Sequence, residues 1–173
     1  EVVFRQLDEH TWIGNGHRTY NESLYLVEGN DRAVLIDAGT RVPALDKIVA
    51  GITSKPVTMI LTHGHGDHVG GVGPFPEVWI GPADEQMLRN SQRRYQGQIK
   101  HLTDGETIDL GARSLIGSIV PISLLTIITL IRIVSSVMAA SRASGVTVPS
   151  ASTSRYVIFF NPFYKTKKEC SIA

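Results

Sequence analysis

The sequence predicts an α/β fold, because segments with strand character alternate with a helical pattern along its first 113 residues. Between Val42 and Ile52, apolar residues recur at three- and four-residue spacing, as on the buried face of an amphipathic helix. Short apolar runs at residues 32–37 and 57–62 flank this helix. Strand, helix and strand in this order predict a βαβ unit, whose functional site is expected at the carboxyl ends of its strands.

Further elements are predicted before and after this unit. In chain order they are strands at residues 2–7 and 23–28, a hairpin over residues 24–36, a strand at residues 78–80 and a helix that opens at residues 82–85. Asn15-Gly16 is a turn signal, and Pro82 with the acids after it suits the first turn of a helix. Residues 89–100 are polar and basic, which predicts a solvated helix end and a loop that could overhang a site.

The segment after the second strand of the βαβ unit is the most specific feature of the chain. It reads His63-Gly64-His65-Gly66-Asp67-His68, and it holds half of the six histidines of the protein. Imidazole nitrogen and carboxylate oxygen are preferred ligands of zinc and related divalent ions. The two glycines are expected to adopt backbone angles that let the neighbouring side chains converge. The pattern therefore predicts a metal-binding loop rather than a histidine-rich turn.

At these residues the chain resembles the metallo-β-lactamase superfamily, whose signature is His-x-His-x-Asp-His after a strand. The resemblance covers the first two thirds of the chain. It extends to Asp37-Ala38-Gly39, to residues 69–71 after the loop, and to a hairpin over residues 102–111. The resemblance implies a metallo-β-lactamase-type αββα sandwich, incomplete in this chain.

The resemblance also implies a chemistry. His63 and His65 would serve a first metal ion, Asp67 and His68 a second, and an intact relative is expected to hold two Zn²⁺ ions. A metal-bound hydroxide would attack an ester, thioester, lactam or phosphoester of a small-molecule substrate, with Asp67 orienting the nucleophile. Asp37 could anchor a histidine of the loop, although it could equally be a turn-forming residue before Gly39.

The composition changes after residue 113. Residues 114–173 contain no His, no Asp and one acid, Glu169, against six basic residues, so this tail carries a net charge of +5 and residues 1–113 carry −4. The family's later Gly-His-type ligand, its bridging Gly-Asp and its last histidine have no counterpart here. We therefore divide the chain into a metallo-β-lactamase-like half, residues 1–113, and an anomalous Ser/Thr/Ile-rich tail, residues 114–173. With two ligands left for each ion, weak metal binding and little hydrolysis are expected.

Three interpretations of the tail remain open. The first is a slipped coding frame near Leu115, the second a membrane helix over Leu115–Ile131, and the third a divergent β-rich half with other ligands. A membrane is a partner only under the second interpretation. The alternative to a hydrolase is a non-catalytic half-fold that is tethered to a membrane or binds a partner.

General properties limit the remaining function classes. A chain of 173 residues with 42% hydrophobic residues can bury a core, and a net charge of +1 gives no reason to expect nucleic acid. The lone Cys170 excludes an internal disulfide and suits a reducing, cytoplasmic compartment. The first residues lack the pattern of a signal peptide. His10, His17 and His101 are expected to be surface or packing residues.

Overall fold

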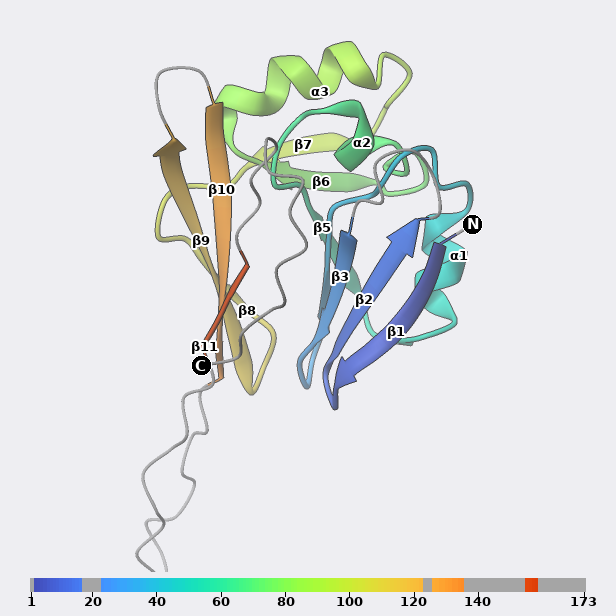
Figure 1. The fold of residues 1–173 in the computed structure, drawn as a ribbon, viewed down its shortest axis with the longest axis vertical. Coiled ribbons are helices and arrows are strands. Elements are labelled where there is room, and N and C mark those ends of the chain that lie inside the picture. The colour runs from blue at the N-terminus through green and yellow to red at the C-terminus, as the bar shows by residue number, and fades with distance from the viewer. Residues whose placement is uncertain (1, 17–22, 123–125, 136–154, 159–173) are drawn as a thin grey trace, which may run out of the picture.

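Two β-sheets lie face to face, and the helices cover the outer face of the larger sheet (Figure 1). The computed structural model describes residues 2–16, 23–122, 126–135 and 155–158. The larger sheet has the strand order β1-β2-β3-β4-β5-β6-β7, and the smaller one the order β11-β10-β9-β8. The described part therefore has three layers, helix on sheet on sheet. This arrangement confirms the α/β class that the sequence predicts and, for the described residues, the pair of packed sheets that the resemblance implies.

The larger sheet changes direction at β4. Its strands are β1 Val2–Asp8, β2 Thr11–Gly16, β3 Ser23–Glu28, β4 Ala33–Ile36, β5 Val57–Ile60, β6 Glu77–Ile80 and β7 Gln98–His101. The first four strands are antiparallel neighbours, whereas β4 to β7 are parallel. Parallel strands need crossover connections, and the helices and the metal loop lie in these connections.

The remaining elements form the smaller sheet and the helical layer. The antiparallel strands of the smaller sheet are β8 Thr107–Asp109, β9 Arg113–Ile122, β10 Thr126–Ser135 and β11 Arg155–Ile158. The helices are α1 Leu45–Ala50, α2 Gly66–Val69, the 3₁₀ turn η1 Pro82–Asp84 and α3 Glu85–Ser91. All of them are short, so their stability comes from packing rather than from helix propensity.

Strand β4 shows why the sheet forms the centre of the molecule. All four of its residues are fully buried, and they alternate between two cores. Ala33 and Leu35 face the helical layer, together with Leu45 and Val49 of α1. Val34 and Ile36 face the smaller sheet. A strand that is buried on both faces reads as a continuous apolar run, which is the pattern in the sequence.

The central βαβ unit and the preceding hairpin match the prediction. Strands β3 and β4 pair antiparallel across the turn at residues 29–31, and β4 and β5 pair parallel around α1. The helix is shorter than the apolar spacing indicates. It begins at Leu45, because Ala44 before it has a left-handed backbone with φ of 54°, and it ends at Ala50.

Two strands of the larger sheet lie outside the predicted set. The first is β2. The turn predicted at Asn15-Gly16 is wrong, because both residues belong to the end of this strand, where Asn15 pairs with Ser23. Strand β7 occupies the end of the segment predicted as loop. It is an edge strand with mostly exposed side chains, so its sequence lacks the apolar alternation of a half-buried strand.

The interpretation of Leu115–Ile131 as a membrane helix is wrong. The described residues of this stretch, 115–122 and 126–131, belong to strands β9 and β10, which pair from Arg113 opposite Ser135 to Ile122 opposite Thr126. Nine of the 17 residues in this stretch are the β-branched residues Ile, Thr and Val, which favour strands over helices. Within the described ranges, no helix has the length and apolar content needed to span a membrane. His17, Cys170 and most of the tail after Ser135 lie outside the described residues.

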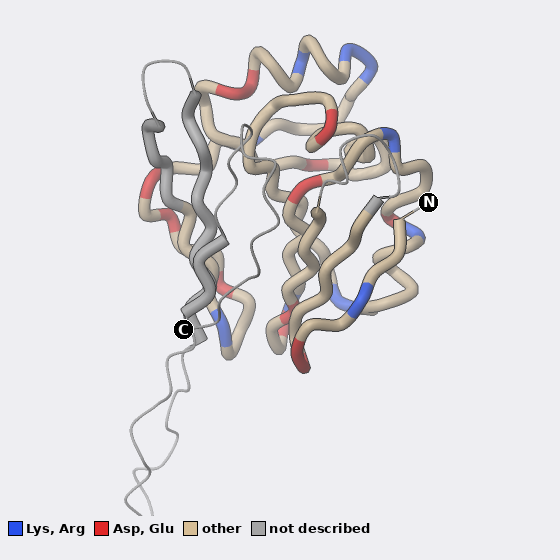
Figure 2. Tube along the Cα trace, in the orientation of Figure 1, with Lys and Arg blue, Asp and Glu red and all other residues tan. Residues whose placement is uncertain are grey.

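Charges of both signs are interspersed over the described elements (Figure 2). Two of the surface ion pairs join Lys100 to Glu77 at 2.8 Å and Arg89 to Glu85 at 2.6 Å. Exposed pairs of this kind contribute little to stability, about 0–1 kcal/mol each. The fold is therefore held by its two apolar cores.

Candidate metal centre

The metal loop begins where β5 ends, between its two neighbouring strands. The backbone N–H of Leu61 still donates to Trp79 of β6 at 2.8 Å, so the chain leaves the sheet only at Thr62. The loop then enters α2, and the N–H of His68 donates to the carbonyl of His65 at 2.9 Å. This single helical turn carries Asp67 and His68 back toward the start of the loop. The site lies at the carboxyl end of parallel strands, as the βαβ pattern predicts.

Three side chains of the loop converge on one point. Ligand atoms of His63, Asp67 and His68 lie within 4.8 Å of one another. The ring centroids of His63 and His68 are 3.9 Å apart, and Nε2 of His68 lies 3.6 Å from Oδ2 of Asp67. The ring of His65 meets that of His63 edge-on at 4.9 Å, but His65 stands outside the three-residue group. The structure thus brings together three of the four side chains that the sequence singles out as ligands.

Asp37 lies directly beneath this group, at the carboxyl end of β4. Its carboxylate is 1% exposed and accepts hydrogen bonds from Nδ1 of His68 at 2.8 Å and from the backbone N–H of Thr62 at 2.8 Å. The Thr62 hydroxyl lies 2.7 Å from Asp37 Oδ2. Asp37 therefore contacts both ends of the loop rather than only its own turn.

These contacts determine which ring nitrogens remain available for a metal. The single hydroxyl hydrogen of Thr62 points to Asp37, so Nδ1–H of His63 donates to the Thr62 oxygen at 3.1 Å. In the same way, Nδ1–H of His68 donates to the carboxylate of Asp37. In the neutral form of each ring, the lone pair then lies on the other nitrogen, Nε2. A carboxylate that fixes the tautomer and orientation of metal-binding histidines is a recurrent feature of metal sites.

The electrostatics of the loop favour the neutral form of one imidazole. Burial lowers the pKa of His63 from 6.5 to about 4, and the nearby His68 acts in the same direction. The carboxylates of Asp37 and Asp67 oppose this shift without cancelling it. At neutral pH the His63 ring is therefore uncharged, which is the form that binds a metal.

The two glycines of the loop, Gly64 and Gly66, were expected to adopt special backbone angles, and the structure does not show this. Among the described glycines, positive φ values occur at Gly39, Gly105 and Gly111, so Gly64 and Gly66 adopt ordinary angles. Gly64 is needed for another reason, because a Cβ there would lie 2.7 Å from the backbone of Leu88 in α3. A Cβ on Gly66 would meet nothing within 4 Å.

Sequence reasoning missed three polar residues around the loop. Thr62 links Asp37 to His63, and Asp84 and Ser91 bond to Gly64 from either end of α3. Thr62 directly precedes the first histidine, and this position could have indicated from the sequence that it contacts the loop. Asp84 and Ser91 lie 20 and 27 residues away from Gly64, and only the fold brings them to it. The remaining described histidines take no part, since His101 binds Glu85 at 2.6 Å and His10 lies in the turn after β1.

Residues 18–86 match the sequence model of the family described as the Metallo-beta-lactamase superfamily. The matched stretch contains Asp37 and the whole metal loop. The family model covers 69 of the 173 residues, so the similarity to the metallo-β-lactamase superfamily holds for this part of the chain. The resemblance seen in the loop sequence is therefore confirmed.

Curated relatives in this superfamily are named hydroxyacylglutathione hydrolase. The protein from Xanthomonas axonopodis pv. citri (strain 306) is 36% identical over 87 residues, which are 47% of this chain and 33% of that protein. The protein from Xylella fastidiosa (strain M12) is 32% identical over 77 residues, 42% of this chain and 29% of that protein. The chain spans about a third of the length of these relatives.

Solved structures of the superfamily share the fold. A mutant metallo-beta-lactamase from Cronobacter sakazakii superimposes with a TM-score of 0.62 at 22% identity, covering 77% of this chain and 60% of that one. Metallo-beta-lactamase SMB-1 gives a TM-score of 0.58 at 18% identity and covers 87% of this chain and 61% of that one. At these identities the likeness concerns the fold alone.

Proposed function

We propose that the loop binds a divalent metal, with Zn²⁺ as the expected ion. We also propose that this chain carries the metal-binding part of a hydrolase active site. The observation that supports this most is the convergence of His63, Asp67 and His68 within 4.8 Å at the carboxyl end of β5. The donor set fits the proposed ions, because it combines imidazole nitrogens with a carboxylate, and the hydrogen bonds to Thr62 and Asp37 use Nδ1 of His63 and of His68. His65, whose ring lies 4.9 Å from that of His63, would be the fourth ligand of the loop.

The residues have separate roles in this proposal. His63 and His65 would hold a first ion, and Asp67 and His68 a second. Asp37 would anchor His68 through the 2.8 Å hydrogen bond and His63 through Thr62. When bound, the metal would polarise the substrate and supply a nucleophile from water near neutral pH. Asp67, whose side chain is 31% exposed, would accept a hydrogen bond from the attacking water and orient it.

The substrate class that we propose is a small thioester or ester, with lactams and phosphoesters as alternatives. The printed name of the curated relatives, hydroxyacylglutathione hydrolase, favours a glutathione thioester. Hydrolysis breaks the bond between acyl carbon and sulfur, places the water oxygen on the acyl carbon, and transfers a proton to the thiolate that leaves. The proposal places the metal site in residues 1–113 and assigns no ligand to residues 114–173, which contain no His or Asp.

The missing later ligands limit the strength of the proposed site. A catalytic zinc usually has three protein ligands, whereas two per ion are available from the loop. We therefore propose weak metal binding and slow turnover for this chain. Two tightly retained zinc ions per purified chain would contradict this part of the proposal.

The test measures metal binding and hydrolysis on the full chain. Zinc content after equilibrium dialysis is compared among the wild type, His68→Ala and the control His101→Ala, whose ring lies at the surface beside Glu85. We expect wild type and the control to bind zinc and His68→Ala to bind at least about 10-fold more weakly. A hydroxyacylglutathione thioester, a chromogenic β-lactam and a phosphodiester are then assayed with and without added zinc. Equal zinc binding by all three proteins would refute the site.

A second candidate function is a non-catalytic half-fold that binds a partner. The observation that favours it is the lack of His and Asp in residues 114–173, which leaves Glu169 and Cys170 as the residues there of a type that commonly binds zinc. Zinc binding without hydrolysis of any of the three substrates would support this candidate over the hydrolase.

A further inference from the structure

Helix α3 contacts the metal loop at Gly64, the residue between His63 and His65. The backbone N–H of Gly64 donates to Oδ1 of Asp84 at 3.1 Å, and the hydroxyl of Ser91 donates to the carbonyl of Gly64 at 3.0 Å. Asp84 lies immediately before α3 and Ser91 is its last residue. Side chains from both ends of one helix therefore hold both polar backbone groups of a single loop residue.

The side chain of Asp84 is committed to the loop and not to its own helix. Asp84 occupies the N-cap position of α3, where an aspartate ordinarily accepts a hydrogen bond from the first turn. Here no side-chain capping bond forms, and the carboxylate is 7% exposed with the Gly64 N–H as its bonded donor. The backbone of Asp84 is helical, because η1 leads directly into α3, so its carboxylate lies outside capping geometry and bonds to the loop instead.

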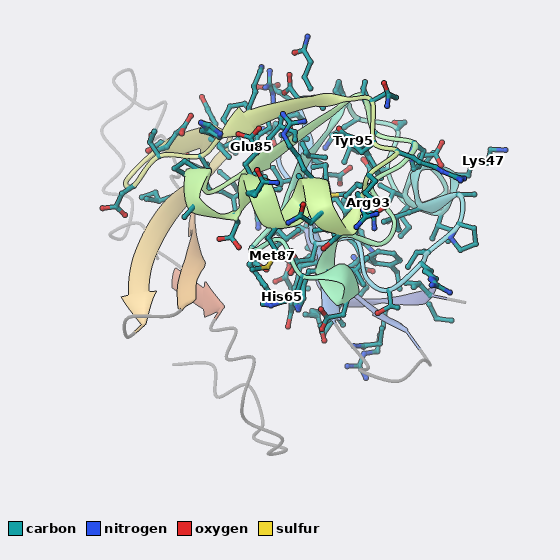
Figure 3. All side chains as sticks on the ribbon, turned by 90° about the horizontal axis from the view of Figure 1, so that it is seen from above. Lys47, His65, Glu85, Met87, Arg93 and Tyr95 are labelled. Carbon is teal, nitrogen blue, oxygen red and sulfur yellow. The ribbon has the colours of Figure 1, made fainter. Side chains whose placement is uncertain are left out.

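The contact between the helix and the loop is also close. A Cβ on Gly64 would lie 2.7 Å from the backbone nitrogen of Leu88 and 2.7 Å from the Cβ of Met87. Leu88 is fully buried in the core under the larger sheet, so the helix cannot move away freely. The labels of Met87 and His65 lie next to each other below α3 in Figure 3, and Met87 is one of the residues that a Cβ on Gly64 would meet.

We propose that α3 is a clamp, in which Asp84 and Ser91 act as positioning residues for the metal ligands His63 and His65. The clamp holds the Gly64 peptide in one orientation, so the two flanking imidazoles are placed before the metal arrives. Preorganisation of this kind increases affinity, because less conformational freedom is lost on binding. This inference rests on the proposed function, since it requires that the loop binds a metal.

The experiment titrates the full apo protein with Co²⁺ and records the visible absorption bands of the bound ion. The variants are Asp84→Ala, Asp84→Asn, Ser91→Ala and the control Gln86→Ala, which removes an exposed residue of the same helix. We expect Asp84→Ala to weaken Co²⁺ binding about 10- to 100-fold, with a shift of the bands, as for other residues that support metal ligands. Ser91→Ala should weaken it about 3- to 10-fold, the loss of one ordinary hydrogen bond.

Asp84→Asn separates positioning from charge and from general stability. Its amide oxygen can accept the Gly64 N–H, so it should restore most of the affinity and the wild-type bands. Gln86→Ala should match the wild type. Should Asp84→Ala fail to fold, Ser91→Ala decides the matter by the same two measurements, because it removes the other hydrogen bond to Gly64.

The outcomes distinguish the clamp from the proposed function. If the wild type binds Co²⁺ and the folded Asp84→Ala and Ser91→Ala variants bind it with the same affinity and the same bands, the clamp is overturned and the metal site stands. If the wild type does not bind Co²⁺ at all, the metal site is overturned and the clamp with it.

Discussion

Asp37 shows how one residue couples the strand, the loop and the site. It has a left-handed backbone with φ of 63°, which Asp and Asn tolerate better than most residues. Its buried carboxylate accepts from the Thr62 backbone and from the His68 ring, and it binds the Thr62 hydroxyl. A buried carboxylate is costly unless donors of this kind surround it. The site and the local fold therefore depend on the same side chain.

Substitution of Asp37 should separate these two roles. Asp37→Ala leaves the buried N–H of Thr62 without an acceptor and should lower the free energy of unfolding by about 2–4 kcal/mol. Asp37→Asn keeps an acceptor and tolerates the positive φ, so it should cost less stability. Both variants should weaken zinc binding about 10- to 100-fold, because neither offers His68 a carboxylate. Urea denaturation and zinc competition measure the two effects, and a stable Asp37→Asn with unchanged affinity would exclude the anchoring role.

At the level of elements, the packing of α3 on the loop makes a matched pair of glycine substitutions informative. Gly64→Ala places a methyl group 2.7 Å from the α3 backbone and should destabilise the fold by about 1–3 kcal/mol through overpacking. Gly66→Ala lies in the first turn of α2, meets nothing within 4 Å, and should be neutral or stabilise by up to about 1 kcal/mol. Thermal unfolding of the apo protein measures both. An equal loss of stability in the two variants would show that α3 moves to make room for the methyl group at position 64.

Elements with a clear apolar period were predictable from the sequence, and those without one were not. Strand β5 and the hairpin of β3 and β4 are marked by buried apolar runs, and α1 by its apolar spacing. The exposed edge strand β7 has no such signal. An apolar stretch such as Leu115–Ile131 fits either a membrane helix or a pair of buried strands, and pairing between β9 and β10 decides this only in three dimensions.

The same distinction holds for the site. The cluster of His63, Asp67 and His68 was predictable, because these residues lie within six positions of the chain. The groups that hold it come from elsewhere in the chain. Asp37 lies 25 residues before Thr62, and Asp84 lies 20 residues after Gly64. The sequence left two equal interpretations of Asp37, an anchor for a loop histidine or a turn-forming residue. Asp84 gave no signal, because an Asp before a helix ordinarily predicts a cap.

At the scale of the whole molecule, one core joins the two sheets. Val27, Val34 and Ile60 of the larger sheet pack with Ile108 and other apolar residues of the smaller sheet and its hairpin. The connection between β8 and β9 also bonds to the turn between β3 and β4, where the N–H of Asp31 donates to a carbonyl of that connection at 3.0 Å. The described sheets should therefore unfold together as one cooperative unit.

Leu110 tests this coupling, because it is fully buried in the core between the sheets. Leu110→Ala should cost about 2–5 kcal/mol, whereas Leu7→Ala, at a half-exposed position of β1, should change stability by no more than about 0.5 kcal/mol. The protein has two tryptophans, so Trp79→Phe leaves Trp12 of β2 as the sole fluorescent reporter, packed against the core on the helical side of the larger sheet. In that background, Leu110→Ala should move the urea midpoint of Trp12 fluorescence together with that of far-UV circular dichroism. A Trp12 midpoint that stays in place while the dichroism midpoint falls would mean that the smaller sheet unfolds by itself. The smaller sheet would then contribute little to holding the metal loop on the larger one.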